Sequence, residues 1–352
     1  MTMNIVFSTT RQWNPGDEFI LMGCMNLLSE HMGDFNPIIF NRNPQTRRAR
    51  KVDIIKMIDN KLGKDFIEKF LDNSVKDRAP MDYADMVVFA GSPEWRGRRT
   101  RKLYDSILEF NLPTVFLGIG TSGPFSFNDE HFSPEEQKVF REAQLITTRD
   151  KNTLEGLQPL KAQHLPCPAL FSSKRTKIVK NVKRIALMYG TNSAVASNNV
   201  SEKTYQYMME VYNRILADFG AEYEIEFVSH YIDELSPFKR DFPNQPVRYS
   251  YDAKDYLDVY DRYDLVIGYR VHGIGISASL GIPGIMLSHD ERSVTVKGFE
   301  AELVNIGTDY SIFKENIKAT ISNIEAKSTA LQKHKDETRE KYLSLFREHI
   351  KM

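Results

Sequence analysis

The chain has 352 residues, of which 41% are hydrophobic and 27% charged, which is typical of a water-soluble globular protein with room for two domains. Its 47 Lys and Arg residues equal its 47 Asp and Glu residues, which argues against a globally basic nucleic-acid binder. No apolar run reaches the ~18 residues that suggest a membrane span. The start, MTMNIVFSTT, is typical of a strand, so we expect a cytoplasmic protein. Cys24 and Cys167 offer neither a disulfide framework nor metal-ligand spacing, so we expect no metal.

Short apolar runs alternate with helical patterns through the first half of the chain. The predicted strands are 4–8, 37–40, 86–90, 114–119 and 145–148. The predicted helices are 18–31, 52–72, 100–110 and 134–143. The last helix has a clear start, because Ser133 can cap it and Pro134 suits its first position. Strands that alternate with helices predict right-handed crossovers and a parallel sheet.

A polar, basic segment at 173–184 has no apolar period, and we interpret it as an interdomain linker. The pattern then restarts, with predicted strands at 185–190, 224–228 and 265–269, predicted helices at 201–219 and 252–262, and a charged helical stretch at 312–350. The predicted fold is α/β, with two Rossmann-like domains that carry parallel sheets. The domains are 1–172 and 185–315, and a C-terminal helix at 316–352 is expected to pack back across both. The active site of such a fold lies in the cleft that faces the carboxyl ends of the strands.

The loops that follow the first and fifth predicted strands contain candidate anion-binding residues. In 13-WNPGDE-18, Asn14 and Gly16 open a helix whose backbone N–H groups could hold an anion. Asp17 is a candidate substrate-binding residue in the same turn. The helix dipole, which favours an acidic residue in the first turn, explains it equally well. Arg149 follows the strand 145–148, where its guanidinium fork suits a carboxylate or phosphate. A structural pair with Asp150 is the alternative.

Two further candidate loops follow the third and fourth predicted strands. The stretch 118-GIGTSGP-124 has the spacing G-x-G-x-x-G, yet no acidic residue ends a strand about 20 residues later, as a dinucleotide site would require. We therefore interpret Gly118 and Gly120 as backbone that approaches another kind of ligand. The arginines of 91-GSPEWRGRRTRK-102 would either contact a phosphorylated or acidic saccharide or form a solvated helix face. Ser92 could cap that helix or bind an anion.

The stretch 265-LVIGYRVHGIGISASLGIPGIML-287 is the richest in candidate residues. A strand period of two predicts that Arg270 and His272 point to the same side at the carboxyl end of the strand. Gly273 and the small residues after it keep the start of the next helix bare, so a ligand could reach its N–H groups. The pattern indicates an anion held by Arg270 while His272 moves a proton.

These motifs, in this order, resemble the polysaccharide pyruvyl transferase family. The matching segments are 14-NPGDE-18, the GIG at 118–120, 149-RD-150, 270-RVH-272, 278-ASLGIP-283 and 288-SHDER-292, which together span roughly residues 4–300. The resemblance implies a fold similar to two-domain GT-B glycosyltransferases. It also implies transfer of the pyruvyl group of phosphoenolpyruvate to sugar hydroxyls, which gives a cyclic ketal and phosphate. The chain departs from the family pattern at 91-GSPEW-95 and 166-PCPAL-170.

Carried onto this sequence, the resemblance implies that Arg270 and Arg149 hold the anionic groups of the donor and that His272 is the acid. Arg292 stands near the position of a lysine that is usual in the family. Phosphoenolpyruvate carries a carboxylate and a phosphate, so two arginines suit it. A histidine with a pKa of about 6.5 could deliver the proton at neutral pH. Phosphoenolpyruvate is a donor substrate in this scheme, and no cofactor is implied.

Two other functions fit parts of the same pattern. A GT-B glycosyltransferase that uses a nucleotide sugar would need a ribose-binding glutamate, for which Glu291 is the candidate; a non-catalytic sugar- or anion-binding relative would need only the arginines. The basic runs 42-RNPQTRRARK-51 and 96-RGRRTRK-102 lack the interleaved aromatics of nucleic-acid binders. An anionic membrane surface or a lipid-linked saccharide acceptor explains them equally well. We expect phosphoenolpyruvate and a saccharide or lipid-linked saccharide as partners, in cell-surface or exopolysaccharide synthesis at the inner face of the membrane.

Overall fold

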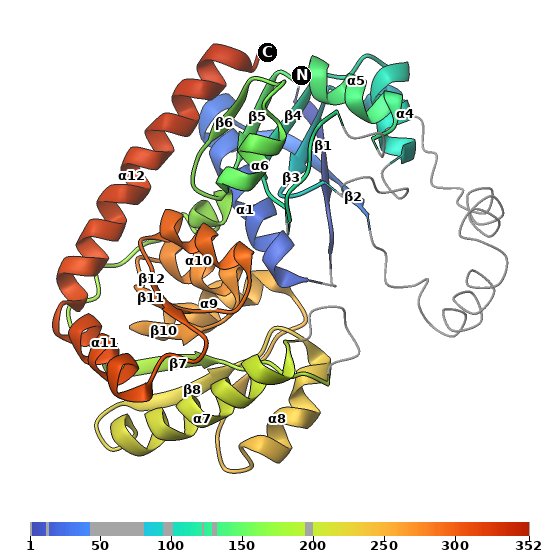
Figure 1. Cartoon of the computed structure of the whole chain (residues 1–352). Helices are drawn as coiled ribbons and strands as arrows, with labels where there is room; N and C mark the ends of the chain where they lie inside the picture. The colour runs from blue at the N-terminus through green and yellow to red at the C-terminus, as the bar shows by residue number, and fades with distance from the viewer. Residues whose placement is uncertain are drawn as a thin grey trace, which may run out of the picture.

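The computed structural model describes residues 2–11, 14–42, 81–93, 101–121, 123–128, 132–193 and 200–351. In these residues the chain forms two domains, each built on a six-stranded parallel sheet (Figure 1). The predicted α/β fold with two Rossmann-like domains is therefore confirmed. The predicted helix at 52–72 lies outside the described residues.

The N-terminal sheet has the strand order β2-β1-β3-β4-β5-β6. Its strands are β1 (Met3–Thr9), β2 (Phe35–Asn41), β3 (Met86–Ala90), β4 (Thr114–Ile119), β5 (Leu145–Thr148) and β6 (Ala162–His164). The helices are α1 (Pro15–Met32), α4 (Arg101–Glu109), α5 (Pro134–Glu142) and α6 (Lys151–Gly156), with 3₁₀ turns η2 (Met81–Tyr83) and η4 (Pro168–Phe171). β3 and β4 are buried along their whole length, because α1 covers one face of the sheet while α4 and α5 cover the other. As predicted, Ser133 caps α5 by accepting the backbone N–H of Glu136 at 3.1 Å.

The C-terminal sheet has the order β12-β11-β10-β7-β8-β9. Its strands are β7 (Arg184–Met188), β8 (Glu224–Val228), β9 (Val247–Arg248), β10 (Leu265–Gly268), β11 (Gly284–Ser288) and β12 (Glu302–Asn305). The helices are α7 (Glu202–Phe219), α8 (Leu235–Asp241), α9 (Tyr256–Asp261), α10 (Val271–Ser279), α11 (Tyr310–Ser322) and α12 (Ile324–His349). Three 3₁₀ segments, η5 (Ile232–Glu234), η6 (Ala253–Asp255) and η7 (Glu291–Phe299), follow β8, β9 and β11. The order reverses between β7 and β10, so the loops after these strands border the crevice where such sheets bind ligands.

One hydrophobic core runs through both domains. It joins α1 and η4 of the N-terminal domain to α10 and α12, and it contains Phe19, Phe171 and Ile276. α1 approaches η4 so closely that a Cβ on Gly23 would lie 1.8 Å from the carbonyl oxygen of Pro168. Cys24 and Cys167 are buried thiols in this core. The shared core holds the carboxyl ends of the two sheets against each other.

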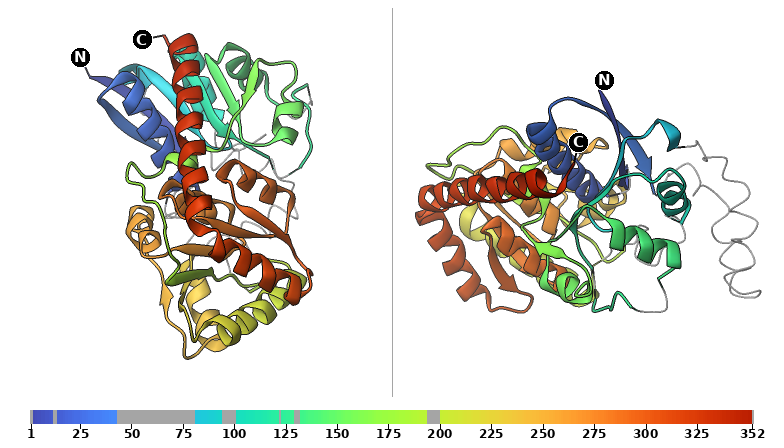
Figure 2. Two further views of the ribbon diagram at one scale, coloured as in Figure 1. Left: turned by 90° about the vertical axis from the view of Figure 1, so that its left-hand side faces the viewer. Right: turned by 90° about the horizontal axis from the view of Figure 1, so that it is seen from above.

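Helix α12 runs along both domains, as the left view of Figure 2 shows in red. Near its start, Ser328 donates to the carbonyl of Gly281 at 2.6 Å, at the end of α10. Near its end, Tyr342 donates to the carbonyl of Pro166 at 2.8 Å in the N-terminal domain. The expected single helix at 316–352 is divided at Asn323, where α11 ends and α12 begins. No helix among the described residues has the length and apolar character needed to cross a membrane.

Candidate functional site

The candidate site lies where loops at the carboxyl ends of the two sheets meet. The N-terminal sheet contributes the loops after β1, β3, β4 and β5, and the C-terminal sheet contributes those after β8, β10 and β11. Hydrogen-bond contacts from Arg149 to His272 and from Tyr231 to Asn14 join them directly. The candidate site is therefore built from residues of both domains.

Arg149 and His272 form the central pair. Arg149 directly follows β5, and its Nη1 lies 3.1 Å from Nε2 of His272 on α10. Its Nη2 also lies 3.5 Å from Oγ of Ser92, which follows β3. A guanidinium can only donate, so Nε2 of His272 is the acceptor, and the neutral ring carries its proton on Nδ1. The structure brings together two predicted site residues that are far apart in sequence.

The environment of His272 opposes protonation. Burial, then the charges of Arg149, Arg292 and His230, hold the pKa of His272 well below 6.5. His272 is also the second residue of α10, where the helix dipole disfavours a cation. The expectation that His272 titrates at an ordinary pKa is wrong, because the sequence did not reveal the burial of the ring or the arginines beside it.

The N-terminus of α1 faces the same imidazole. A Cβ on Gly16 would lie 2.6 Å from Nδ1 of His272, so this position requires glycine. Asn14 caps α1 by accepting the N–H of Gly16 at 3.1 Å, and it also accepts the hydroxyl of Tyr231 at 3.0 Å. Asp17 accepts a hydrogen bond from the hydroxyl of Thr10, which gives it a structural partner in the first turn.

Arg270 points to different partners from those of His272. It forms an ion pair with Glu234, and its guanidinium lies 4.3 Å from the ring centre of Tyr231 and 4.7 Å from that of Tyr269. Burial opposes its charge, but Glu234 outweighs burial and raises the pKa of Arg270, which therefore stays protonated. The buried Nε has no hydrogen-bond partner among the described residues.

The prediction that Arg270 and His272 share one side of a strand is wrong. β10 ends at Gly268, Arg270 is the N-cap of α10, and His272 already lies on the helix. The period of two does not extend through a turn from strand to helix. Arg270 consequently contacts the loop after β8, whereas His272 contacts the N-terminal domain.

Glu234 organises the site, and sequence reasoning missed it. Its Oε2 accepts the hydroxyl of Ser229 at 2.6 Å and the backbone N–H groups of His230 and Tyr231 at 3.0 and 3.2 Å. Its Oε1 accepts the hydroxyl of Tyr269 at 3.2 Å and binds Arg270. The available signal was its position at the end of the short acidic turn after a predicted strand, a pattern that favours capping.

Of the remaining predicted glycines, Gly118 and Gly273 serve packing within the protein. Gly118 has a positive φ of 65°, and a Cβ there would lie 2.2 Å from Cδ of Pro168. Gly273 makes room for Met188, whose Sδ would lie 2.6 Å from an added Cβ. At Gly120 an added Cβ would lie 2.4 Å from Nε of Arg149. Of these three, Gly120 is therefore the one that shapes the site, because its lack of a side chain admits Arg149.

Arg292 and His289 border the site on the side of β11. Arg292 is half-exposed and donates through Nε to Asp290 at 3.0 Å. His289 packs its ring edge-on against Tyr269, with 5.4 Å between the ring centres. Its buried Nδ1 has no hydrogen-bond partner among the described residues. The basic runs at 42–51 and 96–102 lie almost wholly outside those residues; Arg42 itself is buried and donates to the carbonyl of Ser92.

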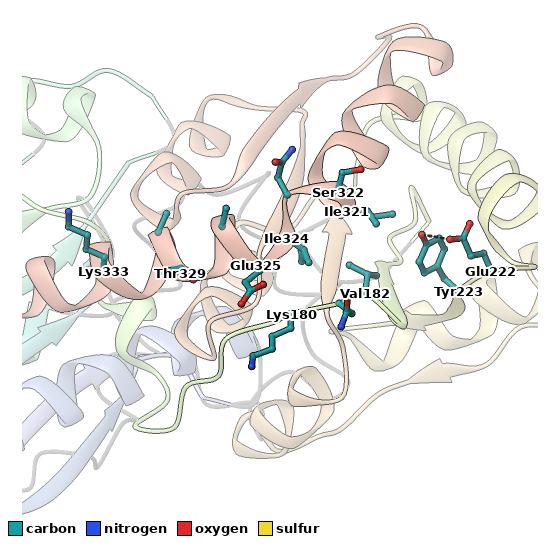
Figure 3. A pocket seen from close by; sticks show the side chains of 14 residues that line it. Lys180, Val182, Glu222, Tyr223, Ile321, Ser322, Ile324, Glu325, Thr329 and Lys333 are labelled. Atoms are coloured by element: carbon teal, nitrogen blue, oxygen red, sulfur yellow. Dashed lines mark hydrogen bonds between the residues drawn. The ribbon is translucent and has the colours of Figure 1, made fainter.

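A separate cavity of about 1110 Å³ opens between the linker, the end of α7 and the junction of α11 with α12 (Figure 3). Its lining mixes Lys180 and Lys333 with Glu222 and Glu325, and it contains none of the site residues. Among the described residues no group of three His, Cys, Asp or Glu side chains is arranged to hold a metal ion.

Comparison with known proteins gives a family and a fold. A model of the family described as polysaccharide pyruvyl transferase matches residues 14–291. None of the curated proteins matches the sequence. Among solved structures, the chain is similar to one described as a UDP-N-acetylglucosamine 2-epimerase from Listeria monocytogenes. The TM-score is 0.53 at 12% identity, and the match covers 93% of this chain and 90% of that chain.

A second similar structure is UDP-GlcNAc 2-epimerase from Neisseria meningitidis bound to UDP-GlcNAc. Its TM-score is 0.50 at 13% identity, with 97% of this chain and 100% of that chain covered. At such low identity the likeness concerns the fold alone. The fold is GT-B-like, as expected from the two facing sheets.

Proposed function

Because the chain belongs to the polysaccharide pyruvyl transferase family, we propose that it moves the pyruvyl group of phosphoenolpyruvate onto two hydroxyls of a saccharide, forming a ketal and releasing phosphate. The observation that carries the proposal is the 3.1 Å contact between Arg149 and His272, which come from opposite sheets. It joins a guanidinium that can bind an anion to an imidazole that can carry a proton, at the position where ligands bind such folds.

The donor would be held by the arginines around this contact. Arg149 offers a planar fork that suits a carboxylate or phosphate, and the unpaired Nε–H of Arg270 is a second donor held in place by Glu234. Arg292 adds positive charge beside them. The half-exposed Arg292 and the partly buried Arg270 would bind the two anionic groups of the donor together with Arg149.

In this reaction an anion on Arg149 would compete with His272 for the guanidinium and would add negative charge beside the ring. Both effects raise the pKa of His272, so the imidazole can become protonated once the donor is bound. The imidazolium then gives its proton to the methylene carbon of the donor, which leaves an oxocarbenium-like centre on the neighbouring carbon. One sugar hydroxyl attacks this centre, phosphate leaves, and a second hydroxyl closes the ketal. The two hydroxyl protons are taken up by the neutral imidazole and the departing phosphate.

The acceptor in this proposal is a saccharide or a lipid-linked saccharide, used in cell-surface or exopolysaccharide synthesis in the cytoplasm. The proposal includes no cofactor, because phosphoenolpyruvate itself supplies the carbon skeleton and the leaving group. The family assignment supports the saccharide, and the cationic site supports an anionic donor.

The alternative is a GT-B glycosyltransferase that uses a nucleotide sugar. It is favoured by the likeness in fold to an epimerase bound to UDP-GlcNAc. The two functions differ in the first ligand that the protein should bind, which makes them separable without knowledge of the acceptor.

The test is thermal unfolding and calorimetry with phosphoenolpyruvate and, separately, with UDP-GlcNAc. Phosphoenolpyruvate should stabilise the wild type, by about 2.7 kcal/mol at a hundred times its Kd. Arg149→Ala should weaken binding by about 100-fold, since it removes charge-assisted hydrogen bonds. The control Arg175→Ala removes an exposed arginine paired with Asp258 and should bind normally. Stabilisation by UDP-GlcNAc alone would favour the glycosyltransferase.

A further inference from the structure

Tyr231 connects the two halves of the site. It lies in the loop after β8 of the C-terminal domain, and only 7% of its surface is exposed. One face of its ring covers the guanidinium of Arg270 at 4.3 Å. Its hydroxyl donates to Oδ1 of Asn14, in the N-terminal domain, at 3.0 Å. A single side chain therefore contacts a candidate donor-binding residue and the loop of the opposite domain.

Glu234 holds Tyr231 and Arg270 in a fixed position relative to each other. The same carboxylate accepts the backbone N–H of Tyr231 at 3.2 Å and pairs with Arg270. A second ring, that of Tyr269, lies 4.7 Å from the guanidinium of Arg270. Arg270 is thus fixed relative to Tyr231 by a shared carboxylate and by ring contacts, and these interactions are strongest where water is excluded.

In the N-terminal domain, Asn14 connects Tyr231 to His272 through Gly16. Its Oδ1 also accepts the N–H of Gly16, and Gly16 is the residue whose missing Cβ leaves room for the imidazole. A shift of Asn14 would move the first turn of α1 against His272. The contacts therefore form a chain from Arg270 through Tyr231, Asn14 and Gly16 to His272. This chain crosses between the domains twice, from Tyr231 to Asn14 and from Gly16 to His272.

We propose that Tyr231 is a positioning residue that couples the placement of Arg270 to the docking of the α1 N-terminus on His272. Donor binding at Arg270 and proton transfer at His272 would then require the same closed arrangement of the two domains. The inference rests on the proposed function for its kinetic consequence, but the coupling itself concerns contacts of the ligand-free protein.

A double-mutant cycle tests the coupling in the reaction. Tyr231→Phe removes the hydroxyl and keeps the ring on Arg270, while Asn14→Ser keeps an N-cap oxygen but cannot reach Tyr231. Each variant should lower kcat/KM for phosphate release from phosphoenolpyruvate by about tenfold, the value of one hydrogen bond. The double variant should be no worse than either single one. Losses that multiply to about a hundredfold, or a Tyr231→Phe enzyme equal to the wild type, would overturn the proposal.

A second measurement does not depend on the reaction. Titration of the His272 ring by NMR in the ligand-free protein reports its contact with Arg149 and α1; the other groups that act on it are Arg292 and His230. Tyr231→Phe should shift this titration toward ordinary histidine behaviour, because the α1 N-terminus is less firmly docked. The control Tyr223→Phe removes an exposed hydroxyl bonded to Glu222 and should change nothing. An unchanged titration in Tyr231→Phe would refute the coupling, whereas a changed titration without turnover would refute the proposed reaction alone.

Discussion

At the scale of single residues, the site holds a histidine that cannot easily be protonated until something changes around it. His272 accepts a hydrogen bond from Arg149 and is further opposed by Arg292 and His230. An anionic ligand is the natural partner for the two arginines, and it would reverse the balance at His272. Proton delivery would thus depend on donor binding, because the imidazole becomes basic enough to carry a proton only when an anion lies beside it.

The electrostatic part of this argument predicts the behaviour of Arg149→Gln. Removing a cation near the imidazole stabilises the imidazolium, so the pKa of His272 should rise toward its ordinary value of about 6.5. The rise should be partial, because burial remains the largest cause of the lowered pKa. Histidine ring titration by NMR measures it, with Arg292→Gln as a variant that should give a smaller rise. A His272 that titrates as in the wild type would contradict the role given to Arg149.

At the scale of elements, the site depends on two helices that begin against each other. α1 starts at Pro15 and α10 at Val271, and Gly16 in the first turn of α1 lies against the ring of His272. Two positive helix termini in one place favour bound anions and disfavour a histidine cation. The arrangement therefore explains both the expected ligand and the low basicity of the histidine.

A methyl group at Gly16 should disturb this approach. In Gly16→Ala the new Cβ would need the space of Nδ1 of His272, so either the ring or α1 must move. Misplacement by about 1 Å can reduce a rate by about a hundredfold, and we expect a fall of that order in phosphate release. Gly123→Ala is the matched control, since no atom lies within 4 Å of the added Cβ there. Full activity in Gly16→Ala would show that the contact is not required.

The sequence predicted the elements that carry a strong pattern and missed those defined by distant contacts. Fully buried strands such as β3 and β4 were predicted, because their residues are hydrophobic on both faces. The short strands β6 and β9 have two or three residues at sheet edges and no such signal. Arg149 and His272 could be identified from their places after strands. Their contact, and the role of Glu234, could not, since both depend on how loops from different strands pack together.

At the scale of the whole molecule, α12 fastens the two domains together. Its buried Lys335 donates to the carbonyl of Ser173, where the chain leaves the N-terminal domain, at 3.1 Å. The same Nζ donates at 2.5 Å to the carbonyl of Ser279, the last residue of α10. Farther along the helix, Tyr342 and Arg339 contact the N-terminal domain. Three elements thus meet at the ammonium group of Lys335, namely α10, the linker and α12.

Replacing this ammonium should weaken the whole fold. Lys335→Met leaves two buried carbonyls without their donor, which should cost about 2 kcal/mol in the free energy of unfolding at pH 7. Burial lowers the pKa of Lys335 to about 8, below its unfolded value, so the wild type gains stability as pH rises through 8. The difference in unfolding free energy between the wild type and Lys335→Met should therefore increase by about 1 kcal/mol between pH 7 and pH 9. Urea unfolding measures both, and Lys333→Met, which removes an exposed lysine, should leave stability unchanged within about 0.5 kcal/mol.

The histidines at the candidate site predict how the stability of the protein responds to acid. Burial lowers the pKa of His230 and His289 as it does that of His272, so all three are neutral in the folded protein at neutral pH. The unfolded chain binds protons at these histidines below about pH 6.5, and the folded protein does so only at lower pH. Stability contributed by the neutral rings is therefore present above pH 6.5 and is lost as pH falls through the lowered values.

The unfolding free energy should accordingly decrease from pH 7 to pH 5. His230→Gln should reduce this decrease, because glutamine can still bond to Tyr260 in place of Nε2 but cannot titrate. Its stability at pH 7 would be compared first, so that any loss of packing against Phe19 is separated from the slope. If the wild type and His230→Gln lost stability equally on acidification, this buried histidine would not be a source of the acid sensitivity. Groups elsewhere in the molecule would then govern the response of the two-domain core to acid.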